Sequence, residues 1–534
     1  MLGGELISHF VNVMLLTVVI APLILWRYRR AVLAGMLDRG GAALPLAPVA
    51  PAASDHRAPT AAGVAPASAL AWEARMRKRI FCAVLAALAP SAVLLAVQTL
   101  ALGGQPLTPA HVFLIAGSTL SMAVPIFAVL TATSFWRAFR LWLVTLVALA
   151  ALDVLLSMLQ RPFYGRTPTL DQAMNFVYFL QYAAYTLWLP TLLALALGAR
   201  RVRGVAPIAF AALLVFALAP LFGVHLTQWL AGMQWSAGWV LAGPGLDAGI
   251  VILALPIGVL AWWRLKALAR SYEAKRFSDA QLLAHSWWLV VVVSRSAEMV
   301  AVYPGTSSLL QILAVSAVGY FLFPALLARA LRWAQAGAPA PPPRTLLLLR
   351  VFGDTARTER LFDRVATRWQ RFGPVTMIAA PDVGARMVDP GDLLRFATGD
   401  IATGFIKSQQ DLARQLAAID VRPDRDGRYR VNEFYCRDDT WQATVVELIA
   451  RADAVVMDLR GFSAERRGCE FELRELAARL APGRIVLIVD ASTDRALLAQ
   501  LVPAGATPMR IVEIVRGNER QTEAAFAALL QAAA

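Results

Sequence analysis

Nine long apolar segments in the first 331 residues limit what this chain can fold into. Each has about the length that an α-helix needs to cross the hydrocarbon core of a bilayer. The chain has 534 residues and a mean hydropathy of +0.56, which is too apolar for a soluble enzyme. The sequence therefore predicts an all-α transmembrane bundle of about nine spans. The segments are residues 7–26, 80–102, 111–133, 141–159, 174–199, 208–229, 248–263, 282–302 and 307–331.

Basic residues indicate how this bundle is oriented. Residues 1–343 carry 24 Lys and Arg against 10 Asp and Glu, whereas residues 344–534 carry 27 against 26. Within the first half, nearly all of the basic residues fall on alternate connections, as cytoplasmic loops require. We therefore expect an external N-terminus and a cytoplasmic C-terminal domain, and topology explains the basic excess without a nucleic-acid partner. Arginine far outnumbers lysine and alanine is abundant, which is typical of a GC-rich bacterium, so the expected location is the bacterial inner membrane, as a multi-pass protein.

Composition divides the chain into five parts. The first span occupies residues 1–30 and an Ala/Pro-rich cytoplasmic linker follows at 31–78. An eight-span domain covers 79–334, and the Pro-rich hinge QAGAPAPPP covers 335–343. Residues 344–534 form the cytoplasmic domain.

Three ionisable residues lie inside the expected spans, where a charge is costly and commonly functional. Asp153 lies in the outer half of the fourth span, and Arg295 and Glu298 lie in the outer half of the eighth. Their similar depths would allow Asp153 and Arg295 to pair between helices. Such a pair would serve transport or sensing, or would be a buried structural contact.

The pattern after residue 343 changes to short apolar runs that alternate with amphipathic segments. This alternation predicts an α/β domain with a doubly wound parallel sheet of the flavodoxin type. An insert at about 382–439 contains an expected helix at 408–419 and, at 428–435, one arm of a small hairpin. Because ligands bind at the carboxyl ends of such strands, five residues become candidates for ligand binding. The expected strands are 346–352, 375–380, 452–459, 484–490 and 509–515, and the candidates are Gly353, Asp354, Asp458, Arg460 and Gly461.

The most informative stretch is residues 452–476, where a buried strand leads into a helix that starts near Glu465. On a helical wheel, Cys469, Leu473, Leu476 and Leu480 share one face. Glu472 lies about 60° from that face, so we expect it to be half buried beside the sheet.

Residue types exclude several chemistries in the C-terminal domain. It contains no histidine, since the five histidines lie at positions 9, 56, 111, 225 and 285. A Ser-His-Asp triad and a His-ligated metal site are therefore excluded there. The three cysteines are widely spaced and form no zinc motif, and no phosphate-binding loop of the Gly-x-x-x-x-Gly-Lys type is present. Carboxylates, tyrosine and cysteine remain for acid-base or nucleophilic chemistry.

The strand, the short loop and the helix with Cys469-Glu470-Phe471-Glu472-Leu473 resemble the TIR (Toll/interleukin-1 receptor) domain. That family carries a Trp-Cys-x-x-Glu-Leu signature, and here Gly468 stands where the tryptophan would be. The resemblance covers roughly residues 345–530. It implies that Glu472 is the catalytic residue for cleaving the glycosidic bond of NAD, which would be a substrate and not a bound cofactor. It also implies a homo-oligomer that forms through this domain.

Three classes of function stay open. The first is a membrane-anchored signalling or defence protein that hydrolyses NAD, and nucleoside deoxyribosyltransferase chemistry is a near relative of this. The second is a non-catalytic receptor or scaffold that recruits partners. The third is a transporter with a regulatory cytoplasmic domain. The expected partners are the lipid bilayer and further copies of this chain, and no nucleic acid is expected.

Overall fold

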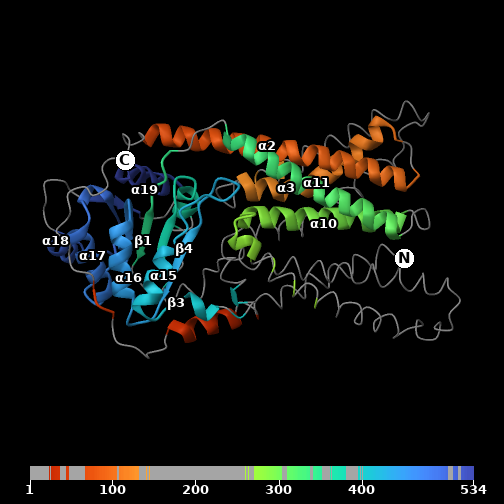
Figure 1. Cartoon of the computed structure of the whole chain (residues 1–534). Helices are drawn as coiled ribbons and strands as arrows, with labels where there is room; N and C mark the ends of the chain where they lie inside the picture. The colour runs from red at the N-terminus through yellow and green to blue at the C-terminus, as the bar shows by residue number, and fades with distance from the viewer. Residues whose placement is uncertain are drawn as a thin grey trace. The chain divides into compact units, whose positions relative to one another are not determined.

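The computed structural model divides the chain into two compact units (Figure 1). The helical unit comprises Met1–Leu25, Arg79–Ala334 and Asp389–Leu394, and the α/β unit comprises Trp26–Lys78, Gln335–Val388 and Arg395–Ala534. Apart from a few single positions, the structure describes residues 26–36, 44–46, 66–104, 107–131, 270–302, 309–336, 341–350, 364–379, 401–502, 509–514 and 519–533.

Four long helices are described in or entering the helical unit: α2 (Pro66–Leu102), α3 (Pro109–Thr131), α10 (Asp279–Val302) and α11 (Leu309–Ala336). Several of their hydroxyl groups donate to backbone carbonyls one turn earlier in the same helix. Thr99, for example, donates to the Leu95 carbonyl at 2.7 Å. Indole N–H groups join the helices, since Trp287 donates to Met122 O in α3 at 2.7 Å and Trp288 to Gly319 O in α11 at 3.0 Å.

Two of the described helices, and not about nine, are long and apolar enough to cross a membrane. They are Ala67–Leu102 and Ala314–Ala336. The expected spans at 111–133 and 282–302 do form helices α3 and α10, but polar residues such as Gln281, His285 and Arg295 dilute the apolar character of α10. The five other expected spans lie wholly or largely outside the described residues and stay predictions.

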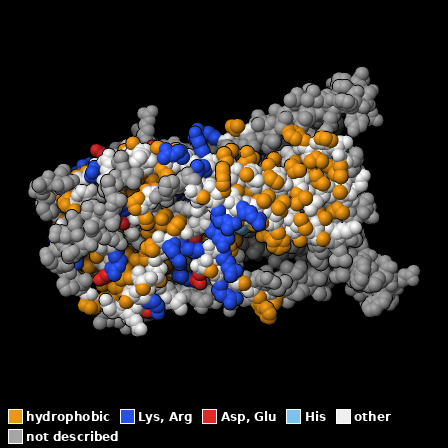
Figure 2. All heavy atoms as spheres, turned by 45° about the horizontal axis from the view of Figure 1, so that its top comes forward, with side chains coloured by type: hydrophobic (Ala, Val, Ile, Leu, Met, Phe, Trp, Pro, Cys, Tyr) orange, Lys and Arg blue, Asp and Glu red, His pale blue; other side chains and the backbone are white. Residues whose placement is uncertain are grey.

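Large apolar side chains are exposed on the surface of the helical unit. They include Phe81, Leu85 and Val93 on α2, Phe113 on α3 and Phe321 on α11, the last 67% exposed. Figure 2 shows such side chains gathered over one face, with few charges among them. A surface of this kind fits contact with lipid.

The α/β unit is built on a seven-stranded sheet in which every pair of neighbours is parallel, in the order β3-β4-β2-β1-β5-β6-β7. All five strands expected from apolar runs are confirmed. They are β1 (Leu346–Arg350), β2 (Val375–Ala379), β5 (Ala454–Asp458), β6 (Ile485–Val489) and β7 (Arg510–Glu513).

The insert also contributes strands, and here the expected hairpin is wrong. β4 (Val431–Cys436) pairs in parallel with β2, starting from Val375↔Val431, and β3 (Phe405–Ile406) pairs in parallel with β4. The burial of β4 does not alternate either, since its first three residues are partly buried and its last three are buried. The local pattern predicts a strand but not its partner, because the paired residues of β2 and β4 are more than 50 positions apart in the chain.

Helices cover both faces of the sheet (Figure 1). One face of the sheet packs with α16 (Trp441–Arg451) and α17 (Arg467–Arg479), and the strands contribute Leu347, Val455 and Leu487 to that core. A third helix, α19 (Glu519–Ala532), contacts β5, β6 and β7. Two shorter helices are α15 (Gln409–Ala417) and α18 (Arg495–Leu501). Both helices are capped at their N-terminus. The side chains of Ser408 and Asp494 accept hydrogen bonds from backbone N–H groups in the first turn of α15 and α18, respectively.

Part of the expected linker at 31–78 is helical and belongs to the α/β unit. Residues 26–36 form a helix in which Tyr28, Val32 and Met36 are buried at four-residue spacing. The Tyr28 hydroxyl lies 3.1 Å from that of Tyr435 in β4. The sequence analysis divided this helix between the first span and the linker, because a single apolar stripe becomes stable only against a partner surface.

The first turns of α2 also pack on the α/β unit. Glu73 accepts a hydrogen bond from Arg368 at 2.9 Å, and the Trp72 ring lies 5.6 Å from the Phe372 ring. Both Glu73 and Trp72 are buried. The α/β unit therefore includes chain far upstream of residue 344, where the sequence placed its start.

Candidate functional site at the carboxyl ends of β1 and β5

The topology places one crevice position at the centre of the sheet. β1 and β5 are neighbours in register, with Arg350 opposite Asp458, and the chain leaves β1 toward β2 on one side and β5 toward β6 on the other. In a doubly wound sheet, ligands bind where the connections diverge in this way. Asp458, Arg460 and Gly461 lie on the β5 side of this point, whereas Gly353 and Asp354 lie outside the described residues.

Asp458 and Arg460 form a closed ion pair. The Arg460 Nε donates to Asp458 Oδ1 at 2.8 Å and its Nη2 donates to Oδ2 at 2.6 Å. The Arg460 backbone N–H also donates to Oδ1, at 3.2 Å. Both side chains are buried, at 1% and 6% exposure for Asp458 and Arg460. Their first role is thus to hold the turn that follows β5, with each satisfying the other.

The loop after β5 is also tied to the loop after β6. Gly461 has a φ of +76°, a conformation in which glycine is favoured, and its N–H donates to Ser492 Oγ at 2.9 Å. Thr493 Oγ1 donates to the Leu459 carbonyl at 2.9 Å. Sequence reasoning missed Ser492 and Thr493, although an Asp-x-Ser-Thr run directly after an apolar strand is a turn signal that could have indicated them.

Glu472 is more buried than expected. It is 2% exposed in the second turn of α17, among the buried residues Cys469, Leu473 and Leu476. The predicted buried face, completed by Leu480, is confirmed. Glu470 by contrast pairs with Arg474 on the exposed side of the helix. Glu472 is therefore not an ordinary surface glutamate.

Among the other side chains that could take part in a reaction, Cys436 is excluded as a nucleophile. Burial raises the pKa of the Cys436 thiol to about 12, so it is not a thiolate nucleophile at neutral pH. No group of three or more potential metal ligands occurs within the part of the chain that the structure describes.

The three ionisable residues expected inside membrane spans are only partly described. Arg295 is 6% exposed in α10, and Glu298 lies one turn further along the same helix. Asp153 lies outside the described residues, so its pairing with Arg295 stays a prediction.

Removing Asp458 should destabilise the α/β unit strongly. Asp458→Ala leaves the Arg460 guanidinium buried without its counter-ion, and we expect a loss of about 3–5 kcal/mol in the free energy of unfolding. Thermal unfolding of the full chain in detergent measures this loss as a lower midpoint. The matched control is Glu470→Ala, which breaks the exposed Glu470–Arg474 pair and should cost about 0.5 kcal/mol or less. Equal midpoints for the two variants would contradict the buried pair.

Comparison with known proteins adds no relative. No family model, curated protein or solved structure matches the chain.

Proposed function

We propose that this chain is a bacterial integral membrane protein whose cytoplasmic α/β domain, similar to a TIR domain, cleaves the N-glycosidic bond of NAD. Glu472 is the catalytic residue. The observation that carries the proposal is the burial of this carboxylate, at 2% exposure, on the helix that follows the central strand β5. Burying a carboxylate costs free energy, and that cost is a frequent mark of a functional site.

The strand order supports the same proposal. Without the insert strands, the order β2-β1-β5-β6-β7 is the flavodoxin-like order of a doubly wound sheet. β3 and β4 extend the β2 edge and leave the pair β1 and β5 unchanged. The two described strands of the insert therefore do not separate β1 from β5.

The proposed reaction requires one anionic side chain and no general acid to protonate the leaving group. The bond between ribose C1′ and the nicotinamide nitrogen breaks, and its electron pair passes to the positively charged ring, which leaves as neutral nicotinamide. The Glu472 carboxylate stabilises the cation that develops at C1′, or attacks it. Water then adds to C1′ and releases a proton, so ADP-ribose is the second product. Asp458 and Arg460 hold the loop, and Gly461 leaves backbone space for the substrate.

The test uses the full chain, because residues 26–36 and 66–78 are part of the α/β unit. Purified protein is reconstituted into vesicles at low and high density, and nicotinamide release from NAD is followed over time. We expect turnover that rises with density, as a homo-oligomer requires. An absence of nicotinamide release at every density would overturn the proposal.

A non-catalytic receptor is the second candidate, and the closed Asp458–Arg460 pair favours it. Because each side chain satisfies the other, neither charge is available to a ligand as the site stands. In that case, proteoliposomes would show density-dependent association of the α/β units without nicotinamide release.

A further inference from the structure

A second group of buried charges lies at the opposite edge of the sheet. Arg371 precedes β2 and Arg428 precedes β4, so both lie at the amino ends of the strands, away from the crevice. They are each 6% exposed. The pKa of Arg371 is also affected by three further charges, which are Glu73 and Arg77 of α2 and Asp426. We call Arg371, Arg428, Asp426, Glu73 and Arg77 the amino-edge cluster.

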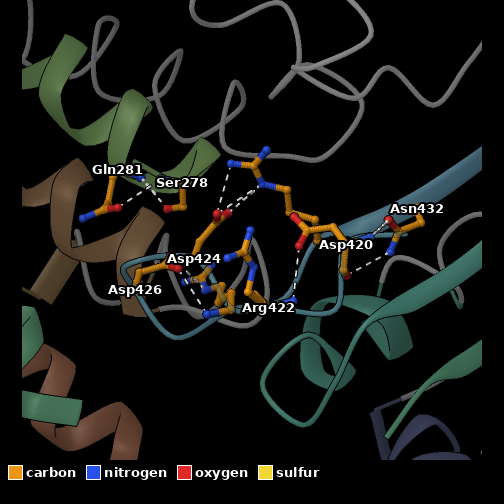
Figure 3. A network of polar contacts seen from close by, with 9 residues as sticks. Ser278, Gln281, Asp420, Arg422, Asp424, Asp426 and Asn432 are labelled. Atoms are coloured by element: carbon orange, nitrogen blue, oxygen red, sulfur yellow. Dashed lines mark hydrogen bonds and ion pairs between the residues drawn. The ribbon is translucent and has the colours of Figure 1, made fainter. Parts of the chain in front are cut away.

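Each nearby carboxylate is already held by another arginine. Asp424 accepts three hydrogen bonds from Arg430, at 3.0–3.2 Å, and Asp426 Oδ2 lies 3.6 Å from Arg428 Nε. Figure 3 shows Asp424 and Asp426 turned toward arginine side chains in this way. Glu73 pairs with Arg368 at 2.9 Å.

Arg371 is left without such a partner. Within the part of the chain that the structure describes, its guanidinium makes no ion pair, and its buried Nη1 has no hydrogen-bond acceptor. Burial, together with the like charge of Arg428, lowers the pKa of Arg371 to about 9 although Asp426 and Glu73 act to raise it, so the group is still protonated at neutral pH. A buried cation with a second cation beside it is strongly unfavourable unless an anion compensates both.

We infer that the amino-edge cluster binds a phosphate group, with Arg371 as its principal ligand and Arg428 beside it. A guanidinium donates two parallel N–H groups to phosphate oxygens, and the phosphate charge removes the repulsion between the two arginines. This site goes beyond the proposed NAD cleavage and lies at the other end of the strands.

The position of the cluster indicates two sources for the phosphate. Gln335, at the end of the candidate span α11, donates to the Arg425 carbonyl at 2.5 Å, so the loop that carries Arg428 adjoins the end of a candidate membrane helix. Basic pockets at such places bind the headgroups of anionic phospholipids. A soluble phosphate offers the same chemistry.

The test measures thermal unfolding of the full chain and of Arg371→Gln in a neutral detergent. Inorganic phosphate, or phosphatidylglycerol in mixed micelles, is added against chloride at matched ionic strength. We expect the wild-type midpoint to rise by about 3 °C at a tenfold excess over Kd, and the rise to disappear in Arg371→Gln. A rise with phosphatidylglycerol alone identifies a lipid headgroup, and a rise with inorganic phosphate identifies a soluble ligand.

Two further variants keep the result interpretable. Arg474→Gln removes a guanidinium that is 64% exposed, and it should retain the full rise. Arg371→Lys keeps the charge without the two-pronged geometry, and should retain part of it. If neither addition raises the wild-type midpoint, or if Arg371→Gln retains the full rise, the phosphate site is overturned.

Discussion

Glutamine in place of Glu472 is expected to lower the rate of nicotinamide release about 10²- to 10³-fold. The substitution keeps the shape of the side chain and one acceptor oxygen but removes the negative charge. Only that charge can stabilise the cation that develops at C1′ of the ribose. The measurement is the initial rate of nicotinamide release by full-length protein in dense vesicles, at saturating NAD.

Two controls separate this loss of chemistry from a loss of structure. Glu470→Gln changes a carboxylate two residues away that pairs with Arg474 on the exposed side of α17, and it should leave the rate unchanged. The thermal midpoint of Glu472→Gln should stay within a few degrees of wild type. Equal loss of rate in both variants, or a large fall in the midpoint, would contradict a catalytic role for Glu472.

Alanine in place of Gly373 is expected to destabilise the α/β unit by about 3 kcal/mol or more. An added Cβ would lie 2.0 Å from the Arg344 carbonyl oxygen and 2.6 Å from the Arg344 nitrogen. Both are backbone atoms, and both are bonded in place: Trp369 Nε1 donates to that carbonyl at 2.9 Å, and the Arg344 N–H donates to Phe372 O at 3.1 Å. The clash can be relieved only by moving the start of β1 away from the approach to β2.

The midpoint of thermal unfolding measures this effect, with Gly404→Ala as the matched control. No atom lies within 4 Å of a Cβ added at Gly404. The control should therefore change the free energy of unfolding by no more than about 0.5 kcal/mol. If the Gly373 variant unfolds like the Gly404 variant, the close approach of residues 344 and 373 is absent in solution.

Local pattern was sufficient for much of the α/β unit. The apolar runs at β2, β5 and β6 are buried strands or nearly so, and such runs are informative because burial on both faces excludes polar residues, whereas β7 is a partly exposed edge strand. The wheel of α17 identified Cys469, Leu473 and Leu476 correctly for the same reason. Glu472 was predicted to be half buried, and only the packing around α17 shows it to be almost completely enclosed.

The sequence by itself determined the α/β class of the C-terminal domain, because strand periodicity is a sum of local transfer preferences that each segment expresses alone. Tertiary structure decided the rest. It placed β4 in parallel beside β2, brought residues 26–36 and the first turns of α2 into the α/β unit, and tied the loop after β5 to the loop after β6 through Gly461 and Ser492. These outcomes depend on contacts between residues far apart in the chain, whose free energies exist only once both partners are in place.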